Sequence, residues 1–200
     1  MNKLFLFFFL AIAHQGLAQT ADSNSSPATS ANAVKLPEMD KSPMDMAYFP
    51  DNYPVLKIQG KATDPLVARV IYSRPQKEQR TVFGGLVEYG KVWRLGANEA
   101  TEIELYRDVK VKDKKLSKGR YTIYAIPTET RWTVIFNKDT DVWGAFKYDE
   151  KKDALRVDIP LQKAPVVAEA FSISFARSAN GADMIVAWDE AMATIPFAFK

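Results

Sequence analysis

Apolar and polar residues alternate with a period of two through most of the chain beyond residue 66. Such alternation, in runs rich in β-branched and aromatic residues, is typical of half-buried β-strands. The clearest runs lie at residues 67–72, 102–106, 121–126, 132–137, 155–160, 171–176, 184–188 and 195–199. Asn180-Gly181, between two of the runs, is a strong hairpin signal. The pattern predicts an all-β fold, a single antiparallel β-sandwich or jelly-roll-like domain of about nine short strands.

The N-terminal residues have a different pattern. Lys3 precedes an unbroken apolar run over residues 4–13, and Gly16 and Ala18 place small residues where a signal peptidase cuts. Residues 1–18 are therefore predicted to be a cleaved signal peptide, because the run is too short to span a bilayer. No cysteine follows the cut, and no other apolar stretch is long enough for a transmembrane segment. We expect an exported, soluble protein of the periplasm or the extracellular medium that is not a lipoprotein.

The chain between the signal peptide and the first strands divides into two parts. Residues 19–37 are mostly small and polar, so too little apolar surface is available to repay the entropy of folding, and a disordered linker is predicted. Residues 38–52 combine repeated prolines with Met, Tyr and Phe side chains. Prolines disfavour a helix, so we expect an extended arm that packs on the body of a domain spanning residues 38–200.

The composition narrows the chemistry that this chain can perform. It has 200 residues, 47% hydrophobic and 26% charged, and its net charge of +3 is too small to indicate a nucleic-acid partner. There is no cysteine, and the one histidine, His14, lies in the predicted signal peptide. Histidine-based triads, cysteine nucleophiles and histidine- or cysteine-ligated zinc sites are therefore excluded for the mature chain. We lean towards a non-enzyme without a cofactor, and carboxylate-based catalysis stays open.

Residues 73–101 interrupt the strand pattern with a long glycine-rich segment, the kind of connection that often carries function. The candidate ligand-binding residues, chosen because they can stack on or hydrogen-bond a glycan or a small anion, are Arg74, Arg80, Trp93, Arg94, Asn98, Glu99 and, further along, Trp143. Each also has a structural interpretation. Arg94 and Glu99 would form a buried pair, Asn98 would bond to backbone, and the other arginines and the aromatic rings would serve surface ion pairs and packing.

A metal site is also considered, because Asn137, Asp139 and Asp141 have the spacing of the first three ligands of a calcium loop. That loop requires glycine at its sixth position and glutamate at its twelfth, and here these positions hold Val142 and Tyr148. A polar turn without a metal is therefore predicted.

Several motifs resemble domain-of-unknown-function family 2911. They are Tyr72-Ser73-Arg74-Pro75, Phe83-Gly84-Gly85-Leu86, the run over residues 89–101, Gly119-Arg120-Tyr121-Thr122, the run over residues 132–138, Trp143-Gly144 and the run over residues 153–157. The resemblance covers roughly residues 38–200 and implies an exported bacterial β-rich protein with no established activity. It assigns no catalytic residue.

These observations support three functional hypotheses. The first is a non-catalytic binding module of the cell envelope for a glycan or a small anionic ligand. The alternative is a carboxylate-based envelope hydrolase or lyase that uses Glu99 with Arg94, and a further alternative is a structural protein-interaction module. The sequence leaves open the identity of the ligand, the oligomeric state, the choice between periplasm and medium, and the role of residues 19–45.

Overall fold

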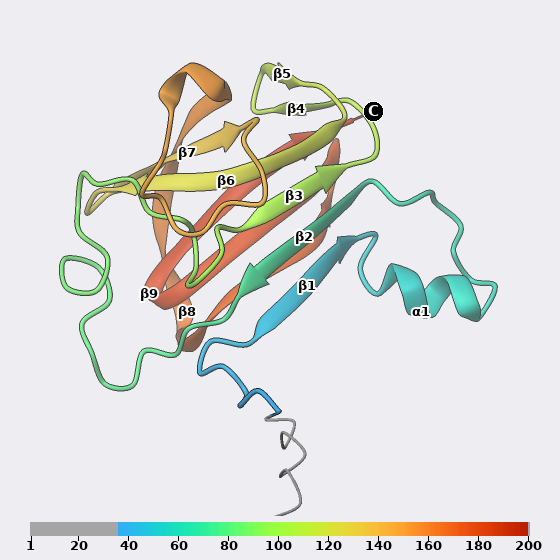
Figure 1. The fold of residues 1–200 in the computed structure, drawn as a ribbon. Helices are drawn as coiled ribbons and strands as arrows, with labels where there is room; N and C mark the ends of the chain where they lie inside the picture. The colour runs from blue at the N-terminus through green and yellow to red at the C-terminus, as the bar shows by residue number, and fades with distance from the viewer. Residues whose placement is uncertain (1–35, 200) are drawn as a thin grey trace, which may run out of the picture. The chain divides into compact units, whose positions relative to one another are not determined.

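The computed structural model describes residues 36–199, and the predicted signal peptide and nearly all of the predicted linker lie outside this range. All the strands fall within one compact unit that begins at Met39. The elements in chain order are β1 (Met44–Phe49), α1 (Tyr53–Ile58), β2 (Ala68–Ser73), β3 (Glu102–Leu105), β4 (Val109–Val111), β5 (Lys114–Leu116), β6 (Gly119–Pro127), β7 (Arg131–Asn137), the 3-10 helix η1 (Glu150–Lys152), β8 (Asp153–Ser178) and β9 (Gly181–Ala198) (Figure 1).

The all-β prediction is confirmed. Within the described residues, nine strands form one antiparallel sheet in the order β1-β2-β3-β6-β7-β8-β9-β4-β5. The strands are less uniform than expected, because β8 has 26 residues and β9 has 18. The predicted Asn180-Gly181 turn joins these two long strands, with Ser178 opposite Gly181 in the register.

The length of β8 allows a single sheet to form two layers. Its first part pairs with β7 as far as Pro160, and its second part pairs with β9 from Leu161 onward. Figure 1 shows β8 and β9 crossing behind β2, β3 and β6. Phe136 of β7 meets Phe197 of β9 edge-on, with ring centroids 6.0 Å apart. The core therefore lies between two facing layers, as in a sandwich.

Alternation along the strands places one set of side chains in this core. β2 and β3 bury every second residue, and β9 does so over most of its length. The largest fully buried side chains include Trp132, Phe136, Phe171, Ile103, Ile123, Met184 and Ile195. Burying an aliphatic or aromatic side chain of this kind contributes about 1.5–3 kcal/mol, so the apolar face of each strand fixes its orientation.

The segment before β2 differs from a simple extended arm. Residues 44–49 form β1, an end strand of the sheet that pairs with β2 from Met44 opposite Ser73 to Phe49 opposite Ala68. The short helix α1 follows, with Pro54 in its first turn, where a missing N–H has no consequence. The helix buries none of its residues, so the hydrophobic pattern gives no signal for it.

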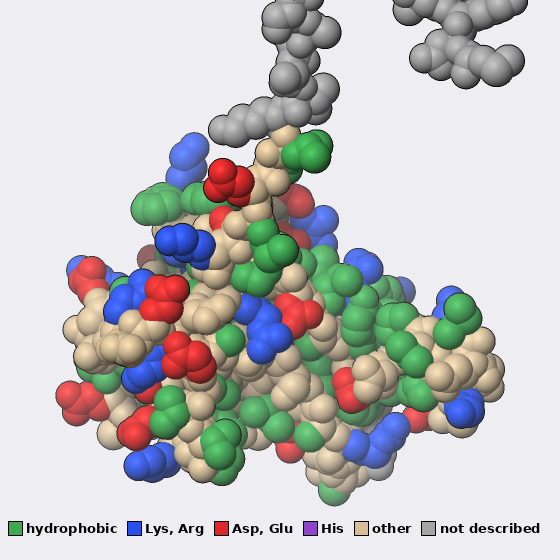
Figure 2. Space-filling view, turned by 90° about the horizontal axis from the view of Figure 1, so that it is seen from below, with side chains coloured by type: hydrophobic (Ala, Val, Ile, Leu, Met, Phe, Trp, Pro, Cys, Tyr) green, Lys and Arg blue, Asp and Glu red, His purple; other side chains and the backbone are tan. Residues whose placement is uncertain are grey.

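Figure 2 shows apolar side chains gathered over β1 and α1. Met44, Met46, Val55 and Ile58 are all at least half exposed there. No helix in the described part of the chain is long and apolar enough to cross a membrane.

Candidate functional site

The glycine-rich segment, residues 74–101, folds against the end of β6. Trp93 exchanges two backbone hydrogen bonds with Ala125 of β6, and the N–H of Gly90 donates to the carbonyl of Pro127. Gly85 approaches the backbone so closely that a Cβ would lie 2.4 Å from the carbonyl oxygen of Thr81. The segment is therefore held by its backbone, and glycine is required where its turns close.

Trp93 lies in the core. Its side chain is only 8% exposed, and its Nε1 donates to the carbonyl of Gly96 at 3.1 Å. Its ring contacts those of Phe83, Trp132, Phe171 and Trp188, with centroids 5.5–6.0 Å apart. The ring is mainly a packing element, and its faces are not free to stack on a ligand from solvent.

Arg74 and Arg80 both have protein partners. Arg74 donates to the carbonyl of Phe171, to the Ser172 hydroxyl and to the carboxylate of Asp45, which connects β1, β2 and β8. Arg80 donates to the carbonyls of Gln76 and Lys77. Neither residue lines the pocket that contains Arg94. The structure thus separates these two arginines from Arg94.

Asn98, Glu99 and Trp143 do lie side by side. The backbone of Glu99 forms an isolated β-bridge with Trp143, and the N–H of Gly144 donates to the carbonyl of Asn98 at 3.0 Å. Asn98 has a left-handed backbone, and its side-chain amide donates to Asp40 at 3.0 Å. The side chains of Glu99 and Trp143 are exposed. This strip joins the glycine-rich segment to the loop of residues 138–149.

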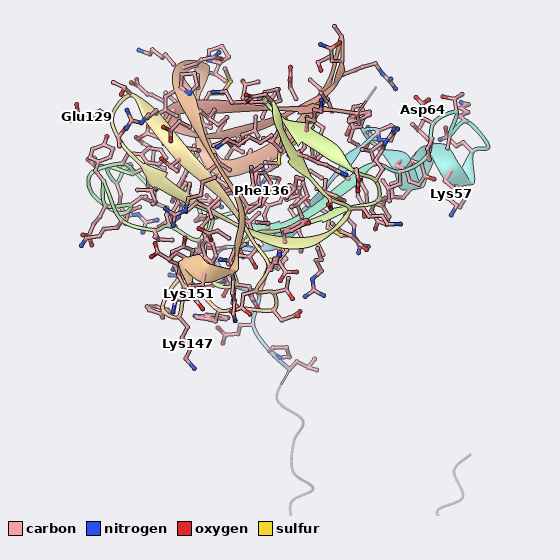
Figure 3. The ribbon with its side chains drawn as sticks, turned by 90° about the horizontal axis from the view of Figure 1, so that it is seen from above. Lys57, Asp64, Glu129, Phe136, Lys147 and Lys151 are labelled. Carbon is pink, nitrogen blue, oxygen red and sulfur yellow. The ribbon has the colours of Figure 1, made fainter. Side chains whose placement is uncertain are left out.

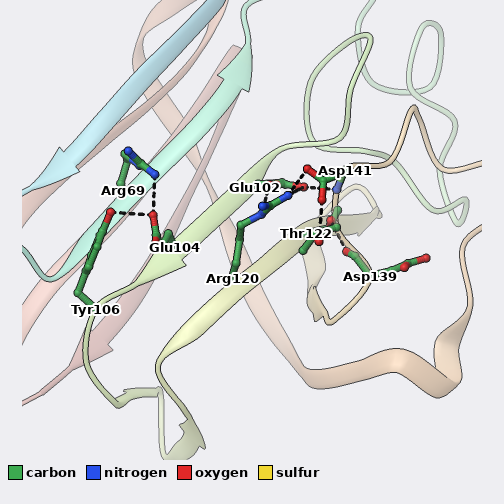
Figure 4. A network of polar contacts seen from close by, with 9 residues as sticks. Arg69, Glu102, Glu104, Tyr106, Arg120, Thr122, Asp139 and Asp141 are labelled. Carbon is green, nitrogen blue, oxygen red and sulfur yellow. Dashed lines mark hydrogen bonds and ion pairs between the residues drawn. The ribbon is translucent and has the colours of Figure 1, made fainter.

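A polar network holds that loop on the sheet (Figure 4). Arg120 of β6 forms ion pairs with both Glu102 of β3 and Asp141 of the loop. The hydroxyl of Thr122 donates to the carbonyl of Asp139 at 2.6 Å. Opposite charges across neighbouring strands therefore help to position a loop that also packs on the sheet through Val142, Ala145 and Tyr148.

Asn137, Asp139 and Asp141, which have the spacing of calcium ligands, all have partners within the protein. Asn137 accepts from the N–H of Asp139 through its side-chain oxygen, and Asp139 pairs with Lys152 at 3.0 Å. Within residues 36–199 there is no group of three or more His, Cys, Asp or Glu residues that could hold a metal ion. Asn137 and Asp139 are thus held in this turn by partners within the protein.

The far end of the loop is fixed by a second polar cluster. The Tyr148 hydroxyl donates to Asp153 at 2.7 Å, and Arg156 donates to the same carboxylate at 2.6 Å. The amide of Asn137 donates to the other oxygen of Asp153. Burial above all, and then the hydrogen bond to Asp153, raise the pKa of Tyr148 to about 12. Figure 3 shows Lys147 of this loop pointing away from the sheet, with Lys151 of η1 close by.

Arg94 is the candidate that faces an open pocket. The pocket has a volume of about 260 Å³ and is lined by Leu86, Val87, Glu88, Lys91, Val92, Trp93, Arg94, Ala145 and Phe146. Its walls come from the glycine-rich segment and from the loop of residues 138–149. Phe146 is 82% exposed, so most of its ring is available to a bound molecule.

The guanidinium of Arg94 has no partner in the part of the chain that the structure describes. Among residues 36–199, no hydrogen bond or ion pair reaches its side chain, and its buried Nε lacks an acceptor. Arg69, by contrast, pairs with Glu104 at 2.6 Å (Figure 4). Burial lowers the pKa of Arg94, because the charged form loses solvation without gaining an acid. The buried Arg94–Glu99 pair considered from the sequence is not formed.

Sequence reasoning identified Arg94 but missed the other wall of its pocket. Ala145 and Phe146 are about fifty residues further along the chain, in a polar loop without a strand pattern. The signal that could have identified this wall is Phe146 itself, a large aromatic residue in a polar loop whose local sequence gives no reason to bury it.

Comparison with known proteins assigns the chain to a family. A search of curated proteins and a search of solved structures found no match. Residues 56–197 match the family model described as protein of unknown function, DUF2911. The matched region contains Arg94 and every other residue that lines its pocket. Because the match covers well over half of the sequence, the chain belongs to the DUF2911 family.

Proposed function

We propose that this protein is a non-catalytic binding module for a small organic anion, with Arg94 as the anion-binding residue. The observation that carries the proposal is the half-buried guanidinium of Arg94, which faces a pocket and has no acidic partner within the described residues. Leaving a charge partly desolvated and unpaired is costly. A carboxylate or phosphate group would remove that cost, because its oxygens match the fork of N–H donors of arginine.

The rest of the pocket suggests the shape of the ligand. Leu86, Val92 and Phe146 provide apolar surface next to Arg94, and Lys91 adds a second positive charge. Glu88 also lines the pocket and disfavours a highly charged anion. A compact carboxylate with an apolar or aromatic body fits this combination better than a bare inorganic ion does.

The geometry favours binding over the hydrolase or lyase alternative. Glu99, the carboxylate that this alternative requires, is exposed and does not line the Arg94 pocket. It is therefore not placed as an acid or base against a ligand held by Arg94. Stacking of a glycan on Trp93 is likewise disfavoured, because the ring is enclosed by other aromatic rings.

We also propose that the module acts outside the cytoplasm. The support is the signal-peptide pattern of residues 1–18, which precedes the residues that the structure describes.

The test measures thermal unfolding of the purified protein with benzoate, acetate and inorganic phosphate. An anion at one hundred times its dissociation constant adds about 2.7 kcal/mol to the free energy of unfolding. We expect benzoate to raise the Tm more than acetate, because only benzoate reaches the apolar wall. Arg94→Met should abolish the shift without lowering the Tm of the free protein, because it removes an unpaired charge and keeps the apolar stem.

Arg131→Met is the matched control, since Arg131 is exposed and lies outside the pocket. It should retain the full benzoate shift. Equal shifts in the wild type and in Arg94→Met would contradict the proposal. So would a marked loss of stability in Arg94→Met, which would assign Arg94 to internal structure.

A further inference from the structure

A second pocket, of about 730 Å³, lies at the other side of the glycine-rich segment and shares no lining residue with the Arg94 pocket. It opens where β8 and β9 approach the turn between β6 and β7. Figure 3 shows Glu129, which lines the pocket, at the tip of that turn. The volume falls within the range of pockets that hold small molecules.

An ion pair lies in this pocket. The Nζ of Lys77 and a carboxylate oxygen of Asp189 are 2.6 Å apart, and the two side chains are 24% and 18% exposed. A partly buried ion pair contributes little to stability, because the cost of desolvation offsets the attraction. One N–H of Lys77 donates to Asp189, and the pair still presents the other N–H donors of Lys77 and the remaining lone pairs of Asp189 side by side to a molecule in the pocket.

The backbone is distorted where it supplies Asp189. The pairing of β8 with β9 shifts register between Lys163 and Ala168, and again between Ala168 and Ser172. Asp189, opposite Ala168, has a left-handed backbone with φ of 54°. Such irregularities turn a side chain away from its normal direction and concentrate at functional sites. Here they place the carboxylate against Lys77 in a pocket lined from both strands.

The remaining walls combine apolar surface with charged groups of both signs. Phe83 and Leu161 are half-buried, and Tyr89 is 41% exposed beside them. The other charged residues that line the pocket are Glu129, Lys163 and Glu190. Lys163 and Glu190 lie 3.8 Å apart as a second ion pair, so four of the five charged groups are paired and the pocket offers little net attraction to an ion.

From this combination we infer that the pocket binds a neutral saccharide. Each hydroxyl group of a sugar both donates and accepts, so two neighbouring hydroxyls match the acceptor of Asp189 and the donor of Lys77. The C–H face of a sugar ring is apolar and fits against the exposed ring of Tyr89. This site is independent of the anion site proposed at Arg94.

The test uses the purified protein with glucose, galactose, mannose and N-acetylglucosamine, followed by saturation-transfer NMR and titration. At least one of these sugars should bind the wild type. Asp189→Asn should weaken that binding roughly tenfold or more, because a charged hydrogen-bond acceptor is lost. Asparagine keeps the shape of the side chain and tolerates the left-handed backbone. Asp183→Asn, on the same strand and outside the pocket, should leave the affinity unchanged.

Two further variants separate the possible failures. Tyr89→Ala removes an exposed ring, so it should weaken sugar binding in a folded protein even where Asp189→Asn does not fold. Arg94→Met should bind the sugar normally, which separates this inference from the proposed anion site. The inference is overturned if no sugar binds the wild type, or if Asp189→Asn and Tyr89→Ala bind as well as the wild type does. Binding of glycine or alanine in place of the sugars, lost in Asp189→Asn, would overturn it in favour of a zwitterion.

Discussion

At the scale of single residues, Trp93 and Trp143, both chosen from the sequence as rings that could stack on a ligand, have opposite surroundings. Trp93 is packed among aromatic rings, whereas Trp143 is 61% exposed. Trp93→Ala should lower the free energy of unfolding by about 3–5 kcal/mol, because it leaves a cavity in a close-packed core. Trp143→Ala should change it by about 0.5 kcal/mol or less, since no buried contact is lost. Urea unfolding of both variants measures this, and similar losses would show that the two rings are equally buried.

At the scale of elements, Tyr148 of the loop that carries Phe146 packs edge-on against Tyr124 of β6, and both tyrosines have raised pKa values. Burial and nearby carboxylates raise the pKa of Tyr124 to about 12, and that of Tyr148 to about 12 as well, from the usual value of about 10. As the pH rises through 10, the unfolded chain therefore loses these protons before the folded chain does. The stability that they provide is complete below pH 10 and is lost between about pH 10 and 12.

The measurement is urea unfolding at pH 8 to 11, together with absorbance titration of tyrosinate. Tyr124→Phe should remove one late-titrating group and flatten the alkaline loss of stability. A loss of stability that is equally steep in this variant would contradict the assignment to Tyr124.

At the scale of the whole molecule, the compact unit that begins at Met39 contains every strand found among residues 36–199. We expect export to remove residues 1–18 and to leave a chain that begins at Gln19 with all its strands. Mass spectrometry and N-terminal sequencing of the protein recovered outside the cytoplasm check this. Recovery of a chain that still begins at Met1 would contradict export by a cleaved signal. Replacing Ala18 with a bulky residue should block cleavage at this position.

Much of the fold is predictable from local pattern. In strands such as β2 and β9, alternate residues are buried and form one face of the strand. A hydrophobic period of two therefore predicts both the strands and the antiparallel sheet. Asn180-Gly181 marks the hairpin for a local steric reason. β1 and α1 are less predictable, because prolines and an exposed helix give no periodic signal. The length of β8 is also not predictable from the sequence, because Pro160 and Pro165 interrupt its hydrophobic pattern. These prolines lie in the region where β8 stops pairing with β7 and begins to pair with β9.

The class of fold, the absence of cysteine and the glycine-rich segment that contains Arg94 can all be read from the sequence. These depend on residue type and local spacing. The packing of the layers was needed to show that Arg94 lacks a partner among the described residues while Arg74 has several, and that Phe146 lines the same pocket as Arg94. It alone brought Lys77 to Asp189. Which residues far apart in sequence come into contact depends on how the layers pack. A short window of sequence holds no information about that packing.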